Sequence, residues 1–286
     1  AGSGAVAGPG AYFHYSNLGY GLLGEVVARL RGAPWWSVVQ ERLLEPLVMT
    51  RTTYGPTGAH ALGQSVGHFT GLLHPEPHTD TGAMAPAGQL WSTLADLATW
   101  TTVLAGRRPE HLSAATAVEM TTPRADSGYG LGLRLVEVNG ARWVGHSGSM
   151  PGFIASLFVD PLTAEATIAL CNATTGLEAE RVPAALLGGT PPEASGWQAT
   201  TDLPVEAEPL LGVWFWGNLA VELRWNHDVL EVRALQSAEL MYTFGLSDGR
   251  FVGLTGYHRG ETLHVHPTHL ECATFVYTRE PDVHAS

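Results

Sequence analysis

Hydrophobic residues recur at intervals of three and four through the first part of the chain, and this spacing predicts amphipathic helices. The helices are expected at residues 18–31, at about 34–45 and at 93–105. Gly32 and Pro34 end the first of them. At the start of the third, the hydroxyl of Thr93 is expected to form a capping-box-like pair with Asp96.

The period of the pattern changes to two after Pro123, which indicates antiparallel strands. They are expected at residues 129–138, 142–145, 152–160 and 166–172. Asn139-Gly140 has the composition of a hairpin turn between the first two. A helix from about 177 to 187 would cover this sheet, so the first part of the chain is predicted to be an α+β domain.

A stretch rich in Pro, Gly, Thr and acidic residues separates this part from the last third of the chain. We therefore predict a first domain at residues 1–188, a linker at 189–204 and a second domain at 205–286. The last third holds short predicted strands at residues 212–216, 220–225, 229–234, 241–245, 250–254, 262–266 and 274–277. Many short strands with regular spacing predict a small closed barrel.

Composition narrows the class of protein. Hydrophobic residues make up 45% of the chain and charged residues 15%, which is typical of a globular protein. A formal net charge of −12 argues against nucleic acid or an anionic membrane as partner, and no apolar run approaches the ~18–20 residues of a membrane span. Cys171 and Cys272 are both expected to be free and buried. Nothing in the chain indicates its localisation, and all 15 of its basic residues are arginine.

Five motifs in the first 172 residues carry the candidate chemistry. They are PGAYFHYSN at 9–17, EPLVMTRTT at 45–53, AGQLWSTLADL at 87–97, YGLG at 129–132 and GHSGSMPGF at 145–153. In this order they resemble segments of the penicillin-recognising serine hydrolases, which include class C β-lactamases, D-alanyl-D-alanine carboxypeptidases and related esterases. Val48 stands where that family usually has a glycine. A single Y-S-N would be weak evidence, whereas the ordered set is specific.

The resemblance implies roles for five residues. Tyr15 would be the general base for a nucleophilic serine, or the partner of that base, and Asn17 would hydrogen-bond the acyl amide of the substrate. His146 would replace the lysine of the family's K-T-G motif and assist proton transfer. Gly148 leaves room for a substrate along the strand, and the N–H of Ser149 would form half of the oxyanion hole. A free tyrosine titrates near pH ~10, so Tyr15 needs a cation nearby to act as a base.

The first of the family's three elements, S-x-x-K, requires a lysine, and this chain has none. We therefore interpret the chain as a C-terminal portion of such a hydrolase, with the nucleophile and the lysine outside it. The implied fold is a β-lactamase/transpeptidase-like antiparallel sheet flanked by helices, with its N-terminal part missing, followed by a lipocalin-like barrel that starts with Gly212-x-Trp214. Residues 55–89 are expected to run over the active-site face. The unpaired sheet edge predicts poor solubility or misfolding, which a sharp, cooperative melt of a purified monomer would contradict.

The implied substrate is an ester or an amide, peptide-like or β-lactam-like, and no cofactor is expected. The implied partner is the missing N-terminal part of the same protein. The alternative is a non-catalytic recognition or scaffolding module that keeps the pocket without the nucleophile. A third hypothesis is a small-molecule carrier built on the barrel.

Three simpler interpretations apply to individual residues. Tyr15-Ser16-Asn17 is also a plausible helix start, with Ser16 or Asn17 as the N-cap. Residues 145–149 approach the G-x-S-x-G nucleophile elbow, but position 149 is serine and a strand is expected to follow. The residues that suggest a zinc site are His264, His266, His269 and Cys272. A solvated, histidine-rich strand explains them better, so no metal is predicted.

Overall fold

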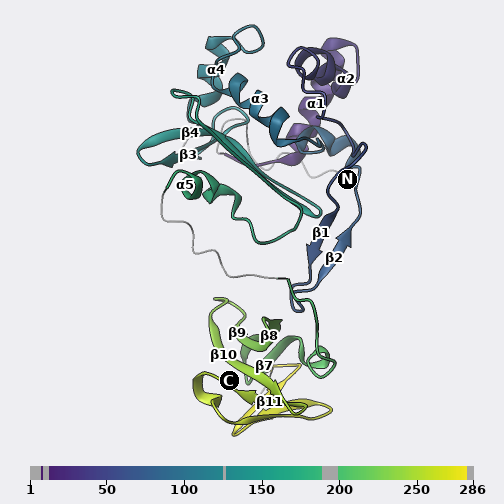
Figure 1. The fold of residues 1–286 in the computed structure, drawn as a ribbon, viewed down its shortest axis with the longest axis vertical. Helices are drawn as coiled ribbons and strands as arrows, with labels where there is room; N and C mark the ends of the chain where they lie inside the picture. Colours follow the sequence, from purple (N-terminus) through teal and green to yellow (C-terminus); the bar gives the residue numbers. More distant parts are fainter. Residues whose placement is uncertain (1–7, 9–12, 125–126, 189–198, 282–286) are drawn as a thin grey trace. The chain divides into compact units, whose positions relative to one another are not determined.

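The computed structural model describes residues 8, 13–124, 127–188 and 199–281 (Figure 1). The chain divides into two compact units. The first comprises residues 1–64 and 75–195, and the second comprises residues 65–74 and 196–286. Most of the predicted linker, residues 189–198, lies outside the described residues. The predicted domain boundaries stay a prediction.

The first unit has an α+β architecture. Its helices are α1 (Asn17–Arg31), α2 (Trp35–Val39), the π-helix η1 (Gln40–Leu44), the 3₁₀ helices η2 (Gly82–Ala87) and η3 (Ala179–Arg181), α3 (Leu94–Leu104), α4 (Ala114–Thr121) and α5 (Val182–Leu186). Its antiparallel sheet has the order β3 (Arg134–Val138), β4 (Ala141–Met150), β5 (Phe153–Val159) and β6 (Ala166–Cys171). This confirms the predicted fold class.

Alternation along the strands places helices on both faces of this sheet. Val144 and Val159 are fully buried on the face that packs against the end of α3. Their neighbours Trp143 and Phe158 point the other way and pack with the region of α5. Successive strand residues face opposite sides, so one hairpin supplies both cores.

Turn chemistry sets the register of β3 and β4. Asn139 and Gly140 have φ angles of 51° and 77°, and the flanking residues Val138 and Ala141 are paired. Two successive positive φ angles match the type I′ turn that follows the twist of a hairpin. The predicted Asn-Gly hairpin turn is confirmed.

Helix α1 packs closely on η2 at Gly24, which has no side chain to keep the two elements apart. A Cβ atom added to Gly24 would lie 2.3 Å from Cγ of Pro86, so no larger residue fits without a shift of the two elements. The predicted apolar face of α1 is present, but it is largely exposed. Its exposed fractions are Leu18 64%, Leu22 62%, Leu23 55%, Val26 48%, Val27 38% and Leu30 79%.

Several details differ from the sequence-based expectations. Thr93 caps α3 by accepting the N–H of Asp96, but the Asp96 carboxylate accepts from Arg51 N–H and the Thr52 hydroxyl, so only half of the capping box forms. Val48, in the position that usually holds glycine, adopts a φ of 57°. The sequence analysis missed α4 and the two-stranded sheet of β1 (Gly63–Val66) and β2 (Leu73–Glu76).

The second unit contains a closed antiparallel barrel of eight strands. They are β7 (Gly212–Trp216), β8 (Leu219–Asn226), β9 (Val229–Ala234), β10 (Leu240–Ser247), β11 (Arg250–Gly253), β12 (Thr262–Val265), β13 (His269–Cys272) and β14 (Phe275–Thr278). Seven were predicted, and β13 was missed. Side chains fill the interior, among them Trp214, Trp225, Phe244 and Phe251. An interior filled in this way is usual for a barrel of eight strands.

Residues 65–74 belong to this second unit although they come early in the chain. The carbonyl of Phe69 accepts the N–H of Trp225 at 2.7 Å, and the carbonyl of Gly71 accepts the N–H of Thr200 at 3.0 Å. His68 Nε2 lies 2.8 Å from a carboxylate oxygen of Glu222. The predicted loop 55–89 is therefore partly a strand hairpin whose tip pairs with the barrel unit.

Candidate active site

Tyr15 and Asn17 lie at the N-terminal end of α1. Between them, Ser16 is the N-cap of the helix, and its hydroxyl accepts the N–H of Gly19 at 3.0 Å. The helix-start interpretation therefore applies to Ser16. Its two neighbours instead line a cavity of the first unit, where the Tyr15 side chain is 51% exposed.

His146, Gly148 and Ser149 lie on β4. This strand continues without a break to Met150, so residues 145–149 do not form the strand-turn-helix of a nucleophile elbow. The Nδ1 atom of His146 hydrogen-bonds the carbonyl oxygen of Ser147. A carbonyl can only accept, so Nδ1 carries a proton, and in the neutral form of the ring the lone pair is on Nε2. Nε2 is thus the nitrogen of His146 that can take or return a proton.

The second half of β4 has a strand partner on one side only. The pairing with β3 ends at Gly145, opposite Arg134, whereas the pairing with β5 continues to Met150, opposite Phe153. In the described part of the chain, residues 146–150 thus present backbone N–H and C=O groups to an open edge. An extended amide chain can add to such an edge by forming main-chain hydrogen bonds.

All five predicted site residues border one cavity of about 1080 Å³. Besides them, α1, η2, the β3 region and the η3 segment contribute Tyr20, Met84, Pro86, Gly88, Tyr129, Arg134, Glu178, Glu180 and Arg181. The cavity is built entirely from the first unit. The structure thus brings together Tyr15, Asn17 and the β4 residues, which lie far apart in the sequence.

Three rings meet at one end of this cavity. The Tyr15 ring centroid lies 6.1 Å from that of His146 and 6.1 Å from that of Tyr129, and Tyr129 lies 5.8 Å from His146. Phe13 stacks on Tyr129 at 4.8 Å. Tyr15 and the proton-carrying imidazole are therefore neighbours, a suitable arrangement for passing a proton through a bound substrate or water.

Sequence reasoning missed Arg134, one of the two arginines among the residues that line this cavity. The Arg134 guanidinium lies 5.6 Å from the Tyr129 ring centroid, and its Nη1 is 3.4 Å from the Tyr129 hydroxyl. Arg134 also forms an ion pair with Glu180. The position of Arg134 two residues after the Y-G-L-G motif was visible in the sequence. Nothing in the local pattern indicated that it faces Tyr129.

Tyr20, in the same cavity, has a raised pKa. Burial raises its pKa first, and the neighbouring Tyr15 and Tyr129 raise it further. Tyr20 therefore stays a neutral phenol at ordinary pH, able to donate a hydrogen bond but unsuited to act as a base. The basic role stays with Tyr15 as a prediction.

The four residues weighed as zinc ligands do not form one group. His266 and His269 gather with Glu271, whereas Cys272 gathers with His258 and Glu261. His264 belongs to neither group. The sequence analysis thus combined residues of two groups, because it had not recognised β13, which has His269 at one end and Cys272 at the other.

Comparison with known proteins identifies the family. The model of the family described as "Beta-lactamase" matches residues 2–189, so this chain belongs to the β-lactamase family. Members of this family are hydrolases, often serine hydrolases. A second model, a domain of unknown function named DUF7586, matches residues 203–279.

Individual relatives agree with this assignment. The D-alanyl-D-alanine-carboxypeptidase/endopeptidase AmpH of Escherichia coli K12 is 31% identical over 94 residues, which are 33% of this chain and 23% of AmpH. A D-stereospecific amidohydrolase from Streptomyces sp. aligns with a TM-score of 0.56 at 25% identity, over 64% of this chain and 56% of that one. The octameric penicillin-binding protein homologue from Pyrococcus abyssi shares the fold, with a TM-score of 0.59 at 23% identity over 96% of this chain and 66% of that one.

The matched regions are partial. The chain spans about a fifth to a third of the length of the curated relatives it matches. Among the described residues, no helix has both the length and the apolar character needed to cross a bilayer.

Proposed function

We propose that this chain supplies the proton-transfer and substrate-binding residues of a serine hydrolase that works through an acyl-serine intermediate. The observation that carries the proposal is the convergence of Tyr15, Asn17 and His146 on one cavity beside the open edge of β4. The serine and its lysine would come from outside these 286 residues, because the sequence contains no lysine.

The proposed substrate is an ester or an amide. An acylated peptide or a β-lactam-like ring would form hydrogen bonds with the backbone groups at the open edge of β4. An extended acyl amide would pair with residues 146–150, with Asn17 as a hydrogen-bond partner at its other side. The names of AmpH and of the Streptomyces amidohydrolase, which describe a carboxypeptidase/endopeptidase and an amidohydrolase, support an amide substrate.

The proposed roles follow from the chemistry of each group. Tyr15 takes the proton of the serine hydroxyl as the acyl carbonyl is attacked. Tyr15 passes this proton to the lone pair on Nε2 of His146, because Nδ1 is held by the Ser147 carbonyl, and Nε2 gives it to the leaving group. In the second half of the reaction Nε2 accepts a proton from the incoming water. Ser149 N–H donates to the oxyanion, and Gly148 keeps the strand free of side-chain bulk. Arg134 orients Tyr129 beside the reacting groups.

The test uses the complete product of the gene that encodes this chain. A fluorescent acylating probe, followed by peptide mapping, would identify a labelled serine and would give the rate of acylation. We expect Tyr15→Phe to lower kcat/KM about 10²–10⁴-fold, the range expected for a general base. Tyr257→Phe, at an 84% exposed position of the barrel unit, is the matched control and should leave the rate unchanged.

Two outcomes would overturn the proposal. A labelled serine whose rate is insensitive to Tyr15→Phe and to His146→Gln would remove their catalytic roles. A complete gene product without S-x-x-K and without a labelled serine would favour the alternative, a recognition module. In that case an unhydrolysable peptide amide should still bind, and Asn17→Ala should weaken the binding.

A further inference from the structure

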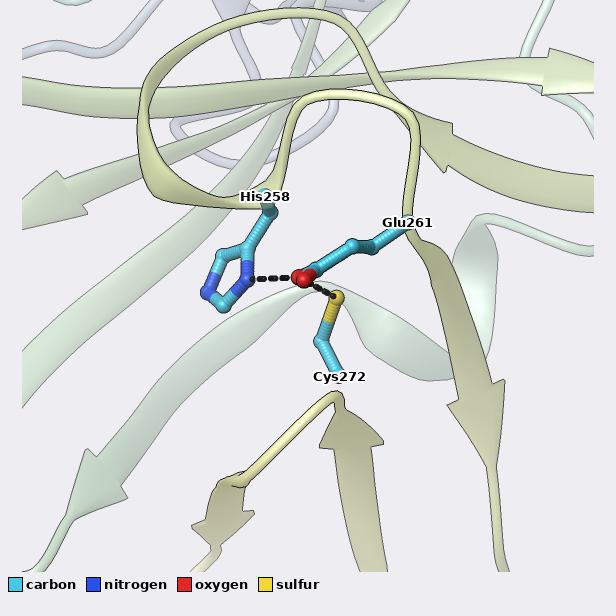
Figure 2. A group of neighbouring side chains, drawn as sticks. All are labelled: His258, Glu261 and Cys272. Atoms are coloured by element: carbon cyan, nitrogen blue, oxygen red, sulfur yellow. Dashed lines mark hydrogen bonds and ion pairs between the residues drawn. The ribbon is translucent and has the colours of Figure 1, made fainter.

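A second group of chemically active side chains belongs to the barrel unit, whereas every residue discussed for hydrolysis belongs to the first unit. His258 ends the 3₁₀ helix η5 (Gly256–His258), Glu261 directly precedes β12, and Cys272 ends β13. Figure 2 shows the three side chains pointing at one another. We propose that they bind one zinc ion through His258 Nδ1, a Glu261 carboxylate oxygen and Cys272 Sγ.

The spacing of the three ligand atoms suits this ion. Nδ1 of His258 lies 3.0 Å from Oε2 of Glu261, and Sγ of Cys272 lies 3.7 Å from the same oxygen (Figure 2). All three ligand atoms lie within 4.8 Å of one another. Tetrahedral zinc bonds of ordinary length put nitrogen and oxygen about 3.4 Å apart, and sulfur and oxygen about 3.6 Å apart. The two separations that involve the carboxylate oxygen thus lie within about half an ångström of those in a tetrahedral zinc site.

The residues around His258 hold its ring in one orientation, as is usual for a histidine that binds a metal. The His258 side chain is fully buried, and its other nitrogen, Nε2, lies 3.1 Å from the hydroxyl of Tyr277. A hydrogen bond at the second ring nitrogen sets the tautomer and the ring orientation in metal sites. The rings of Tyr242 and Phe275 stand edge-on to His258 at 4.8 Å and 4.7 Å and restrict its rotation.

The three ligand types, a thiolate, an imidazole and a carboxylate, determine which metal ion is favoured. A thiolate and an imidazole favour zinc, whereas magnesium and calcium prefer oxygen ligands. Cys272 is fully buried, but the Glu261 side chain is 41% exposed, so an ion can enter and leave along the carboxylate. Three protein ligands leave a fourth zinc position for water.

Each proton that zinc binding displaces has a defined destination. The thiol proton of Cys272 leaves to solvent, and the resulting thiolate takes the ion. The proton that Nδ1 of His258 shares with Glu261 moves to Nε2, where the Tyr277 oxygen accepts it. The bound ion joins the loop between β11 and β12 to the end of β13, so it ties together the ends of neighbouring strands of the barrel. This inference does not depend on the proposed hydrolase activity.

A neighbouring group provides an internal comparison. His266, His269 and Glu271 also place ligand atoms close together, but their side chains are partly or well exposed. His266 and His269 stack at a ring distance of 4.4 Å. Since this group has no sulfur donor, a cobalt ion bound there would lack a thiolate charge-transfer band.

The experiment titrates chelator-treated full chain with Co²⁺ and then with Zn²⁺. We expect a near-ultraviolet thiolate-to-cobalt band that saturates at one equivalent, disappears on addition of one equivalent of zinc, and is unaffected by excess Mg²⁺. Native mass spectrometry should give a single bound zinc. Zinc should also raise the melting temperature of the barrel unit.

Matched variants assign the site. Cys272→Ser should abolish the cobalt band, whereas Cys171→Ser, at the other free cysteine, should keep it. Glu261→Gln keeps the shape of the side chain and should weaken zinc binding at least about tenfold, which covers the case in which Cys272→Ser fails to fold. The double variant His266→Ala/His269→Ala should retain the band. Absence of a band in the parent chain, or a band that survives Cys272→Ser, would overturn the proposal.

Discussion

The two units of this chain differ in how completely their strands are paired and their apolar side chains are buried. In the barrel unit every strand has two neighbours, and the buried side chains form a single continuous core. In the first unit, β3 and β6 each pair with one strand in the described part of the chain, and α1 exposes most of its apolar face. The cavity that carries the predicted catalytic residues belongs to the less complete unit.

Strand pairing that favours stability and an open strand edge that can bind a substrate thus belong to different units. A closed barrel leaves no strand edge unpaired and can fold on its own interactions. The open edge of β4 at residues 146–150 would weaken a purely structural sheet, but it gives a substrate backbone somewhere to bind. We therefore expect substitutions to affect one unit without affecting the other.

The largest difference in stability between the two units is expected from a substitution in the barrel core. Phe244 on β10 is 1% exposed, so Phe244→Ala should lower the free energy of unfolding of the barrel unit by about 3–5 kcal/mol. Leu240→Ala, on the same strand at 45% exposure, should change it by less than about 0.5 kcal/mol. Hydrogen exchange measured by mass spectrometry in denaturant resolves the units. An equal loss of protection in both would show that they unfold as one.

A smaller effect, confined to the first unit, is expected at Asp96. Its nearly buried carboxylate accepts from Arg51 N–H at 2.9 Å and from the Thr52 hydroxyl at 2.8 Å. Asp96→Ala removes the acceptor of the Arg51 N–H and one of the two hydrogen-bond partners of the Thr52 hydroxyl, and it should cost about 1–3 kcal/mol. Glu119→Ala removes only an exposed ion pair with Arg124 and serves as the control. The same exchange experiment should place the whole change in the first unit, and a shift of the barrel would contradict the separation.

A stabilising change is expected at Val48. This residue holds a φ of 57° while its side chain is 73% exposed, so it gains little from packing. The left-handed region costs a residue with a Cβ atom roughly 1–2 kcal/mol, so Val48→Gly should stabilise the first unit by about 1 kcal/mol. Val48→Ala keeps the Cβ atom and should recover less. A denaturation midpoint that falls in the glycine variant would refute the explanation.

The smallest effect is a pH dependence of the barrel. Burial by itself would raise the pKa of Glu231, but hydrogen bonds from Arg233 and Asn226 outweigh it and hold the pKa below its usual value. A lowered folded-state pKa stabilises the fold above the unfolded value of about 4.3, and this contribution is lost as the pH falls through the folded value. The melting temperature of the barrel should drop over this range, and less so in Glu231→Gln. Glu239→Gln, at an exposed position, should behave like the parent chain.

Local signals explain what the sequence could predict of the fold. The strand hairpin at Asn139-Gly140 has its own turn chemistry, and α1 has its own capping serine and terminal glycine. Strand β13, a four-residue strand in which Leu270 and Cys272 are buried, was missed. The hairpin at β1 and β2 was missed because it lies in a Gly-, Pro- and His-rich stretch and depends on distant partners.

The candidate site divides in the same way. Tyr15, Asn17 and His146 lie in contiguous motifs that could be read from the sequence. Arg134 faces Tyr129 because of a tight turn before β3, which no periodicity indicates. His258 comes from a loop, and it lies near Cys272 because β12, which follows this loop, pairs with β13. The sequence analysis had not recognised β13 as a strand, so it did not predict that these residues are close.

Residues 65–74 have a consequence for how the two units are joined. Because this tip pairs with the barrel unit, the backbone passes between the units after residues 64, 74 and 195 rather than once. A protease that cuts only at the last of these crossings would leave the units covalently connected through the first two. An expression boundary placed near residue 200 would remove the carbonyl that Trp225 uses and the imidazole beside Glu222. The barrel is thus best transplanted as a discontinuous module, with a β1–β2 tip engineered into the recipient.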